Sequence, residues 1–382
     1  MTILKVLQIN AVNRISSTGR NCYEISDYLL QKGHKCVTAY SEGPCSGNEN
    51  EYIIGNKLGK KCHALLSRLT GKQGYFSSFA TRGLIRLIEK YNPDIILLGN
   101  LHGNYINVPM LLKYIARCNI ATVIILHDCW FYTGKCCHYT IDNCYKWKKH
   151  CGNCPSLKKY NRSWFFDRTR KMLEDKKKLF SNIPRLAVIG VSDWITQEAK
   201  EAPVLKKARE IIRIYNWIDG DVFYFRNTEK LEESLGVKDK QVILCVASEW
   251  NYEKGLATII QLSNLLSEDQ VLIVVGTIKY EIKWGKKVIH LPPTHSTDVL
   301  AAYYSLADVF VQPSLEETFG KVTAEALACG TPVVCFNSTA NPELVGEGCG
   351  LVVNRGDIEG MNIAINQILR IGKSFYHKQC IR

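Results

Sequence analysis

The sequence predicts an α/β fold of two doubly wound domains, and two observations lead to it. Short apolar runs alternate with amphipathic segments along the chain, a pattern typical of parallel strands connected by helices. Near the middle, the turn-rich stretch Asn216-Trp217-Ile218-Asp219-Gly220-Asp221 interrupts this alternation, which then restarts. We therefore predict an N-terminal domain of residues 1–217 and a C-terminal domain of residues 218–382, since two domains of ordinary size account for this length.

Composition and charge limit the classes of function to consider. Of the 382 residues, 46% are apolar and 22% are charged, which is ample for two folded cores. The formal net charge of +13 fits a partner that is nucleic acid, an anionic membrane or a phosphorylated substrate. No nucleic-acid-binding motif is recognisable, so the sequence favours a membrane surface or a phosphorylated substrate.

The N-terminal residues Met1–Val12 predict a β-strand and not a secretory leader. A lysine interrupts the short apolar run, and neither a basic region nor a small-residue cleavage site is found. No stretch has the roughly 18 uninterrupted apolar residues of a membrane span. We expect a cytoplasmic protein that contacts the inner face of the cell membrane peripherally. The irregular, basic residues 44–80 are either a solvated helix face or a membrane-surface patch.

The first strand–helix unit contains a candidate phosphate-binding loop. The pattern predicts a strand at Lys5–Asn10, a loop through residues 16–19 and a helix that starts near Arg20. The loop has one glycine, Gly19, and lacks the G-x-G-x-x-G pattern, so a dinucleotide cofactor is not expected. Such a loop can still approach a phosphate, although an ordinary connection is an equally good interpretation.

Two buried strands of the first half end in polar loops that contain histidine. Ile95–Leu98 leads into Asn100–Tyr105, and Thr122–Leu126 leads into His127-Asp128. In open α/β sheets, ligands bind outside the carboxyl ends of the strands. His127 is therefore a candidate functional residue, with a structural role as the alternative.

Residues 133–155 form a cysteine-rich insertion of a different kind. It contains five cysteines and two histidines and shows neither helical nor strand periodicity. Cys151 and Cys154 have the C-x2-C spacing of a zinc chelate, and Cys144 with Cys136 (or Cys137) would complete four sulfur ligands. Three interpretations remain open, namely a structural zinc ion, free thiols that pack a loop, or disulfides. The cysteines would fix the insertion and take no part in chemistry.

The stretch Pro313–Phe336 carries the clearest chemical pattern. It predicts a loop with Glu317, a helix with Glu325 and a buried strand. Eight residues span about 12 Å in a helix, so the two carboxylates do not form an acid–base pair on one bond. They can instead hold the two ends of an elongated ligand. The helix start at Phe319-Gly320-Lys321 offers N–H groups to an anion, so a nucleotide sugar fits this arrangement.

These motifs resemble family 4 retaining glycosyltransferases, which have the GT-B fold. The resemblance rests on the E-x7-E pattern of ETFGKVTAE with ALACGTPVV, on Glu253-Lys254-Gly255, on LADVFVQPS and on YNWID at the hinge, and it extends over nearly the whole chain. The first half, with SSTGR, PDIILLGNLHG, LHDCWFYTGKC and CGNCP, is further similar to a subgroup found in bacterial capsule, exopolysaccharide and O-antigen gene clusters.

The resemblance implies two Rossmann-like domains facing across a cleft, with the nucleotide sugar bound mainly by the second. Glu317 would contact hydroxyls of the donor sugar, and Glu325 those of the ribose. Lys254 would bind a phosphate, although by itself it could be a solvated lysine. Gly19 would approach the phosphates from the first domain. The implied catalytic residues are Glu317, Lys254 and His127, and the implied donor-binding residues are Gly19, Lys254, Gly276, Leu291, Glu317, Thr318, Phe319, Gly320, Lys321, Val322 and Glu325.

Two departures from the family pattern affect the site. Many members carry an arginine five residues before the lysine, where this chain has Glu249, so either another cation replaces it or Lys254 carries more of the phosphate charge. The chain also ends soon after Leu369, whereas relatives continue through a helix that crosses back onto the first domain. We therefore expect looser domain closure or a shortened chain. The nucleotide base would lie near Gly276 and Leu291.

The sequence thus predicts a retaining glycosyltransferase that moves a sugar from a UDP- or GDP-sugar to a glycan or lipid-linked acceptor of a cell-surface polysaccharide. No Asp-x-Asp motif follows a strand, so catalysis without metal is expected, and structural zinc is the one cofactor considered. The resemblance implies a front-face mechanism in which the leaving phosphate takes the acceptor proton. A nucleotide-sugar epimerase on the same fold and a basic, zinc-containing nucleic-acid-binding protein are the alternatives.

Overall fold

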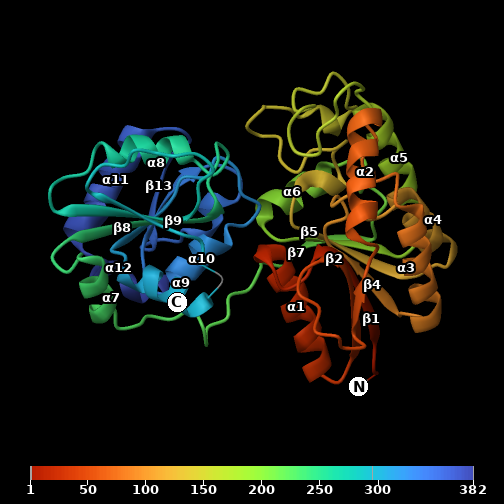
Figure 1. The fold of residues 1–382 in the computed structure, drawn as a ribbon, viewed down its shortest axis with the longest axis horizontal. Coiled ribbons are helices and arrows are strands. Elements are labelled where there is room, and N and C mark those ends of the chain that lie inside the picture. The colour runs from red at the N-terminus through yellow and green to blue at the C-terminus, as the bar shows by residue number, and fades with distance from the viewer. Residues whose placement is uncertain (1, 295, 382) are drawn as a thin grey trace. The chain divides into compact units, whose positions relative to one another are not determined.

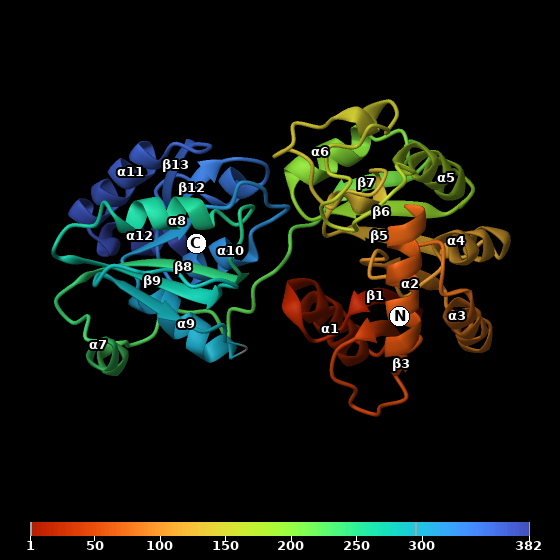
Figure 2. The same ribbon diagram turned by 45° about the horizontal axis from the view of Figure 1, so that its top comes forward.

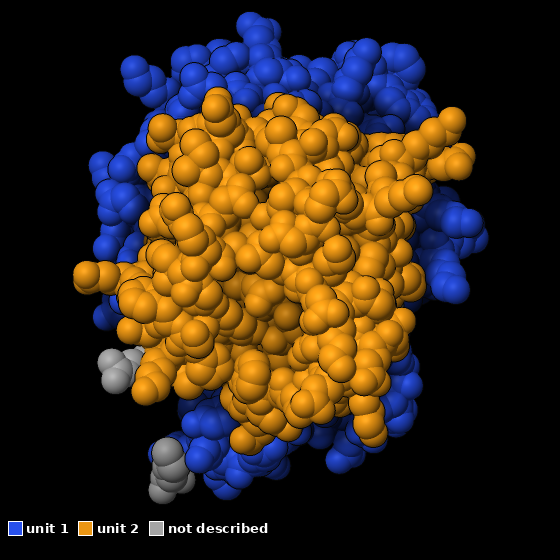
Figure 3. Space-filling view, turned by 90° about the vertical axis from the view of Figure 1, so that its left-hand side faces the viewer, with its two compact units in different colours: residues 1–215 blue, residues 216–382 orange. Residues whose placement is uncertain are grey.

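The structure is a computed structural model that describes residues 2–294 and 296–381, and the chain forms two compact units (Figure 3). Unit 1 comprises residues 1–215 and unit 2 comprises residues 216–382. The division falls directly before the turn-rich stretch, two residues before the boundary predicted after Trp217. Among the described residues, none of the helices combines the length and hydrophobicity that a membrane span requires.

Unit 1 is built around a parallel sheet of seven strands (Figure 1). The strands are β1 (Lys5–Val12), β2 (Lys35–Glu42), β3 (Glu51–Ile53), β4 (Ile95–Leu98), β5 (Ala121–Leu126), β6 (Leu186–Gly190) and β7 (Glu210–Arg213). The helices are α1 (Ser16–Gln31), α2 (Lys57–Thr70), α3 (Ser78–Tyr91), α4 (Val108–Arg117), α5 (Thr169–Ser181) and α6 (Asp193–Glu201). The short 3₁₀ helices are η1 (Cys129–Phe131) and η2 (Lys146–Lys148).

The seven strands follow the order β3-β2-β1-β4-β5-β6-β7, and all the pairings are parallel. Helix α1 covers one face of this sheet, and α3, α4 and α5 follow one another on the opposite face (Figure 2). A parallel sheet covered on both faces needs apolar side chains on both sides. Successive residues of β1, among them Val6 and Leu7, are accordingly buried.

The structure corrects two local predictions in unit 1. Helix α1 begins at Ser16 and not near Arg20, because the backbone turns tightly after β1 and Ser16 already has a φ of +58°. Gly19 therefore lies in the first helical turn, where its carbonyl accepts a hydrogen bond from the backbone N–H of Arg14 (2.9 Å). Residues 44–80 are more regular than expected, since they contain β3, α2 and the start of α3, and α2 agrees with the interpretation as a solvated helix face. Exposed leucines on α2 obscure its period in the sequence.

Unit 2 has a second parallel sheet, with six strands. The strands are β8 (Gln241–Glu249), β9 (Gln270–Thr277), β10 (Val288–Leu291), β11 (Val309–Gln312), β12 (Val333–Asn337) and β13 (Gly350–Asn354). The helices are α7 (Glu229–Leu235), α8 (Leu256–Ser263), α9 (Thr297–Leu306), α10 (Lys321–Ala328), α11 (Ile358–Ile371) and α12 (Lys373–Cys380), with the 3₁₀ helix η3 (Asn341–Leu344).

The order of the second sheet is β10-β9-β8-β11-β12-β13, again with parallel pairing throughout. Helices α8 and α11 pack together on one face, and α9 lies on the other (Figure 2). Helix α12 packs onto unit 2, where the Lys373 ammonium donates to the carbonyls of Ser305 (2.6 Å) and Ala307 (2.8 Å). Two doubly wound α/β units confirm the predicted fold class.

Candidate active site

The carboxyl edge of the unit 2 sheet brings two predicted residues into contact. The connections leave β8 and β11 in opposite directions along the sheet, so these neighbours form a topological switch point, where open α/β sheets bind ligands. The loop after β8 carries Lys254, and the loop after β11 carries Glu317. The Lys254 Nζ atom lies 2.5 Å from Oε1 of Glu317. Two residues that are 63 positions apart in the sequence thus form one charged pair.

The Lys254 loop is held in place by its backbone. The Asn251 side chain accepts a hydrogen bond from the Lys254 N–H (2.8 Å), and the Leu315 N–H donates to the Glu253 carbonyl (2.9 Å). Gly255 has a φ of +80°, and a Cβ atom there would lie 2.1 Å from the Pro313 carbonyl oxygen. Glycine is therefore needed for the two loops to approach each other.

Glu317 is fixed by its own loop and remains partly accessible. Its N–H donates to the Thr339 hydroxyl (2.8 Å), and its carbonyl accepts from the Ala340 N–H (3.2 Å). The Glu317 side chain is 14% exposed and the Lys254 side chain 37%. An ion pair that still meets solvent can exchange partners, because the desolvation penalty for its charges is incomplete. An anionic ligand could therefore take over Lys254.

The start of α10 offers further polar groups. Gly320 is the N-cap residue with a φ of +85°, and no side chain caps the helix. Two buried acceptor atoms, Thr323 Oγ1 and Asn341 Oδ1, have no hydrogen-bond partner among the described residues. Both lie close to Gly320, since a Cβ built there would be 3.4 and 3.9 Å from them. Thr318, Phe319 and Lys321 have buried side chains, so this loop presents mainly backbone.

Glu325 lies in α10 and is buried. Its side chain is 1% exposed, and the hydroxyl of Tyr304 donates to its Oε2 atom (2.9 Å). Val322, the preceding predicted residue on this helix, is half-buried. The buried carboxylate of Glu325 thus already accepts a hydrogen bond from within unit 2.

The positions predicted for the base lie at the ends of β9 and β10. Gly276 and Leu291 are on neighbouring strands, and the His290 ring is within hydrogen-bond distance of the Gly276 carbonyl (2.8 Å). Gly276 has a φ of +136°, and a Cβ there would lie 2.0 Å from the Ala247 carbonyl. At the same edge, Glu249 pairs with Lys279 (2.6 Å), so the carboxylate that replaces the family arginine is neutralised.

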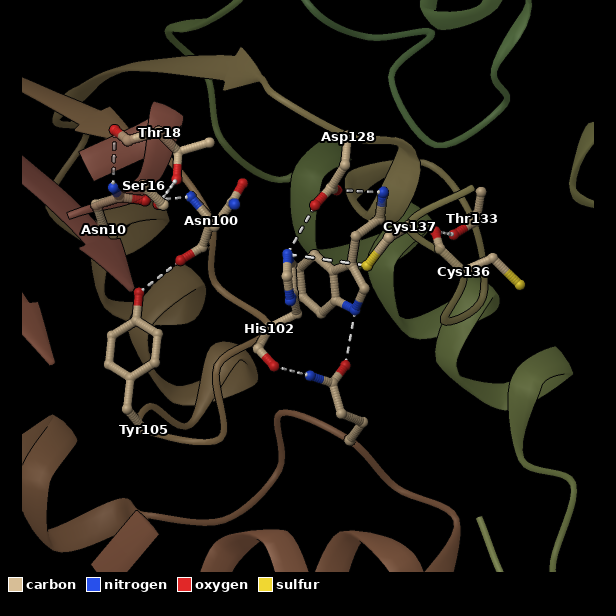
Figure 4. Close-up of polar contacts among 12 residues, drawn as sticks. Asn10, Ser16, Thr18, Asn100, His102, Tyr105, Asp128, Thr133, Cys136 and Cys137 are labelled. Carbon is tan, nitrogen blue, oxygen red and sulfur yellow. Dashed lines mark hydrogen bonds and ion pairs between the residues drawn. The ribbon is translucent and has the colours of Figure 1, made fainter. Parts of the chain in front are cut away.

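In unit 1, the loops after β4 and β5 form a second polar cluster (Figure 4). The His102 Nε2 atom lies 2.7 Å from Asp128 Oδ2 and 3.9 Å from the sulfur of Cys137. Asp128 also accepts from the Trp130 N–H (2.8 Å). The ligand atoms of His102, Asp128 and Cys137 lie within 4.8 Å of one another, although the ion pair already satisfies His102 and Asp128. His127, the predicted neighbour, is half-buried at the end of β5.

The pKa values of this cluster are shifted by the ion pair. Burial alone would lower the pKa of His102, but the facing Cys137 and Asp128 side chains raise it well above 6.5. Burial alone would raise the pKa of Asp128, and the opposing His102 lowers it to about 2. The pair is therefore charged at neutral pH. The sequence drew attention to both loops but did not assign the His102–Asp128 pair, since only the fold brings two separate strand ends together.

Sequence models of two glycosyltransferase families match the chain. The model described as Glycosyltransferase Family 4 matches residues 18–222, which is more than half of the chain. The protein belongs to glycosyltransferase family 4. The model described as Glycosyl transferases group 1 matches residues 227–379, the greater part of unit 2. The resemblance to the family found in the sequence is thus confirmed at this level.

Individual relatives match shorter regions. The family 4 protein is 27% identical over 195 residues to the N-acetyl-alpha-D-glucosaminyl L-malate synthase of Bacillus anthracis, covering 48% of this chain and 50% of the synthase. It is 45% identical over 67 residues to the O-antigen chain mannosyltransferase B of Escherichia coli, covering 18% and 17%. The matched region thus spans half or less of the length of these relatives.

Solved structures of other glycosyltransferases share the fold over the full length. The sucrose-phosphate synthase of Thermosynechococcus elongatus has a TM-score of 0.69 at 16% identity and covers 98% of this chain and 91% of that protein. The Anabaena protein Alr3699/HepE, solved in complex with UDP-glucose, has a TM-score of 0.65 at 15% identity and covers 98% and 93%. These similarities confirm the predicted GT-B fold.

Proposed function

We propose that the protein is a retaining glycosyltransferase that transfers a sugar from a UDP- or GDP-sugar to a glycan or lipid-linked acceptor in the synthesis of a cell-surface polysaccharide. The contact between Lys254 and Glu317 at the switch point of unit 2 carries this proposal. Support for the donor comes from the Anabaena neighbour, whose structure contains UDP-glucose. Support for the acceptor comes from the short match to the O-antigen chain mannosyltransferase.

The ion pair suggests how the donor is received. An arriving diphosphate competes with Glu317 for the Lys254 ammonium, and the released carboxylate can then accept hydrogen bonds from hydroxyls of the transferred sugar. The N–H groups at the start of α10 add a positive dipole end next to Gly320. Thr323 Oγ1 and Asn341 Oδ1 are buried atoms that can accept hydrogen bonds from further hydroxyls of the nucleotide sugar.

The same groups would stabilise the transition state. As the bond between sugar and diphosphate breaks, negative charge grows on the departing phosphate, and preorganised positive groups stabilise it more strongly than water does. In our proposal Lys254 and the backbone N–H groups of α10 supply this stabilisation without a catalytic metal ion. The acceptor oxygen bonds to the anomeric carbon from the same face that the phosphate leaves, and the leaving phosphate takes the proton of the acceptor hydroxyl. Attack from this face retains the anomeric configuration.

Donor binding is tested by thermal shift with a panel of UDP- and GDP-sugars and the free nucleotides. We expect at least one nucleotide sugar to raise the melting temperature of the wild type, because a ligand that binds only the folded state stabilises it. We expect no shift in Lys254→Ala. The product is then analysed by proton NMR for the configuration of the new bond. No binding across the panel, or an inverted product, would contradict the proposal, and a free epimerised sugar nucleotide would support the epimerase alternative.

We further propose that unit 1 contacts an anionic membrane through a surface that we call the α2 patch. It consists of exposed apolar residues on α2 and of an exposed aromatic run that the Trp164 N–H ties to the Arg68 carbonyl at the end of α2 (2.8 Å). Its apolar members are Leu58, Leu65, Leu66, Leu69, Trp164, Phe165 and Phe166, and its basic members are Lys57, Lys61, Arg68, Arg162 and Arg168. Interfacial aromatics beside lysine and arginine are typical of contact with anionic lipids.

Co-sedimentation with vesicles of phosphatidylglycerol and phosphatidylcholine tests the α2 patch. We expect the wild type to bind at low salt and the double variant Phe165→Ser, Phe166→Ser to lose most of this binding. The control is Phe375→Ser, which removes an equally exposed aromatic ring from α12 in unit 2. Equal binding by all three proteins, or no binding by the wild type, would contradict membrane contact through the α2 patch. Neither result would bear on the proposed transfer reaction.

A further inference from the structure

Four of the five cysteines of the insertion surround one small cavity. Its volume is about 20 Å³, and its lining includes Cys136, Cys144, Cys151 and Cys154. These residues come from three turns of a segment whose only helical element is the short η2. The cavity is large enough for a single atom with its immediate partners. A loop segment that lines one small cavity with four cysteines has the ligand types of a structural zinc site.

The structure decides which of the adjacent cysteines takes part. Cys136 and Cys137 direct their sulfur atoms to different sides, with Cys137 facing His102 and Cys136 directed away from it (Figure 4). Cys136 lines the cavity and its thiol is hydrogen-bonded to that of Cys154, whereas Cys137 is not part of the lining. The alternative left open by the sequence is thereby resolved in favour of Cys136.

The surrounding backbone is arranged to hold thiolates. The Gly134 N–H donates to the sulfur of Cys151, and the Ser156 N–H donates to that of Cys154. The turn between these two cysteines is fixed by Lys146, whose ammonium donates to the carbonyls of Gly152 (3.2 Å) and Asn153 (2.9 Å). Such donors to the ligand atoms orient a metal's ligands and stabilise their charge. Trp147 lines the same cavity, and its buried Nε1 has no partner among the described residues.

Two buried lysines next to the cavity provide an independent argument. Lys135 is 2% exposed and donates to the Ser156 and Leu157 carbonyls, and Lys176 is 5% exposed and donates to the Trp130 and Thr133 carbonyls. Neither forms an ion pair with a carboxylate within 4.0 Å in the described part of the chain. A buried cation without a counter-charge is costly.

We propose that Cys136, Cys144, Cys151 and Cys154 bind one structural Zn²⁺ ion and that Lys135 and Lys176 neutralise it. Four thiolates around a divalent ion leave two negative charges, and the two lysines carry two positive ones. The insertion is thereby fixed on unit 1 by metal binding, which takes the place of the regular secondary structure that it lacks. Folding and metal binding of such a segment are coupled, since the ligands converge only in the folded state.

Binding requires the cavity wall to contract. Among the described residues, the ligand atoms of His102, Asp128 and Cys137 lie within 4.8 Å of one another. The sulfur atoms of the four cavity cysteines are farther apart, since no three of them lie within that distance. Cys144 and Cys151 are half-buried and lie in irregular backbone outside the helices and strands, so these segments can move inward. Zn–S bonds of about 2.3 Å then require the sulfur atoms to approach one another to nearly 4 Å.

Metal analysis of the purified full-length chain tests the proposal. Protein purified under reducing conditions without chelator is expected to contain about one zinc ion per chain by plasma mass spectrometry. Titration with a mercurial is expected to release it stoichiometrically, as followed with a chromogenic chelator. Replacement of zinc by Co²⁺ should give the intense visible bands of tetrahedral thiolate coordination. Absence of zinc, or a Cys136–Cys154 disulfide in the mass spectrum of the native protein, would overturn the proposal.

Matched cysteine variants assign the ligands. Cys136→Ser is expected to lose zinc, whereas Cys137→Ser, one residue away, and Cys118→Ser, an exposed cysteine elsewhere, are expected to keep it. Lys176→Met is expected to lower zinc affinity about 10- to 100-fold, the range for the loss of an outer-shell partner. Should Cys136→Ser fail to fold, the cobalt spectrum of the wild type still decides between thiolate coordination and its absence. Zinc retention by Cys136→Ser would contradict the assignment.

Discussion

The Lys254–Glu317 site of unit 2 and the cysteine-rich insertion of unit 1 differ in how their charged side chains are exposed and paired. At the unit 2 site, two opposite charges face each other at the end of a regular sheet and stay partly exposed. Beside the cavity of the insertion, Lys135 and Lys176 of α5 are buried against backbone carbonyls, and neither has a carboxylate partner within 4.0 Å among the described residues. Charges that still meet solvent can exchange partners with a ligand, whereas fully buried charges are bound to the fold. In our proposals, the first region therefore serves the reaction and the second serves stability.

The largest expected effect is on the unit 2 site. Lys254→Ala should lower the transfer rate about 10²- to 10³-fold, which is typical for the loss of one group that stabilises developing negative charge. Because the ion pair is partly exposed, the melting temperature should change little. The control is Lys287→Ala, which removes a lysine paired with Glu268 (2.7 Å) at the opposite end of the sheet. Full activity of Lys254→Ala would break the assignment of function to this region.

A substitution in the insertion should show the reverse pattern. Gly134→Ala places a Cβ atom 2.7 Å from the Thr169 carbonyl and 3.0 Å from the Cys151 sulfur. We expect it to lower the free energy of unfolding by about 1–3 kcal/mol, as overpacking does, with unchanged turnover per folded molecule. Gly220→Ala, where a Cβ meets nothing within 4 Å, serves as the control in urea denaturation. Normal stability with lost activity would reverse the comparison.

The third prediction concerns the His102–Asp128 pair, whose contribution to stability can be tested by changing the pH. The raised pKa of His102 contributes stability that is complete below pH 6.5 and is lost as the pH rises through the folded-state value. The lowered pKa of Asp128 contributes stability that is present above pH 3.8 and lost as the pH falls through about 2. We expect the free energy of unfolding to decline as the pH rises above 6.5, by up to about 1.4 kcal/mol per pH unit.

His102→Asn should abolish that decline, because asparagine can still donate to Asp128 but does not titrate. Chemical denaturation at a series of pH values compares the two proteins. An identical slope in wild type and variant would show that His102 is not the titrating group.

The smallest expected effect concerns the pair Glu249–Lys279. Both side chains are exposed, so their ion pair contributes about 1 kcal/mol or less to stability. If Lys279 supplies the cation that the family arginine provides, Lys279→Ala should weaken donor binding several-fold and leave the melting temperature unchanged. Isothermal calorimetry with the donor measures this, and Lys283→Ala on the same segment is the control. An unchanged dissociation constant would leave Lys254 as the main phosphate cation.

Most of the fold could be predicted from the sequence because buried parallel strands appear as short, uninterrupted apolar runs. Runs such as Ile95–Leu98 and Val333–Phe336 are apolar on both faces and are bounded by turn residues, so their positions were predicted closely. The start of α1 was not predicted correctly. The backbone there turns through Arg14 and Ser16, whose positive φ values are not indicated by their residue types. Residues 44–80 looked irregular because the leucines of α2 are exposed, although one of the two interpretations given for them, a solvated helix face, agrees with this helix.

The sequence by itself determined the family, the two units and the chemical identity of the groups at the unit 2 site, since these follow from local spacing and residue type. Only the tertiary structure decided which groups meet. It paired Lys254 with Glu317 and His102 with Asp128, turned Cys136 and Cys137 apart, gave Glu249 a lysine partner, and buried Glu325 under Tyr304. The contacts of Lys254, His102 and Glu249 join residues at or just after the ends of different strands, so their closeness depends on sheet order, which no local pattern encodes.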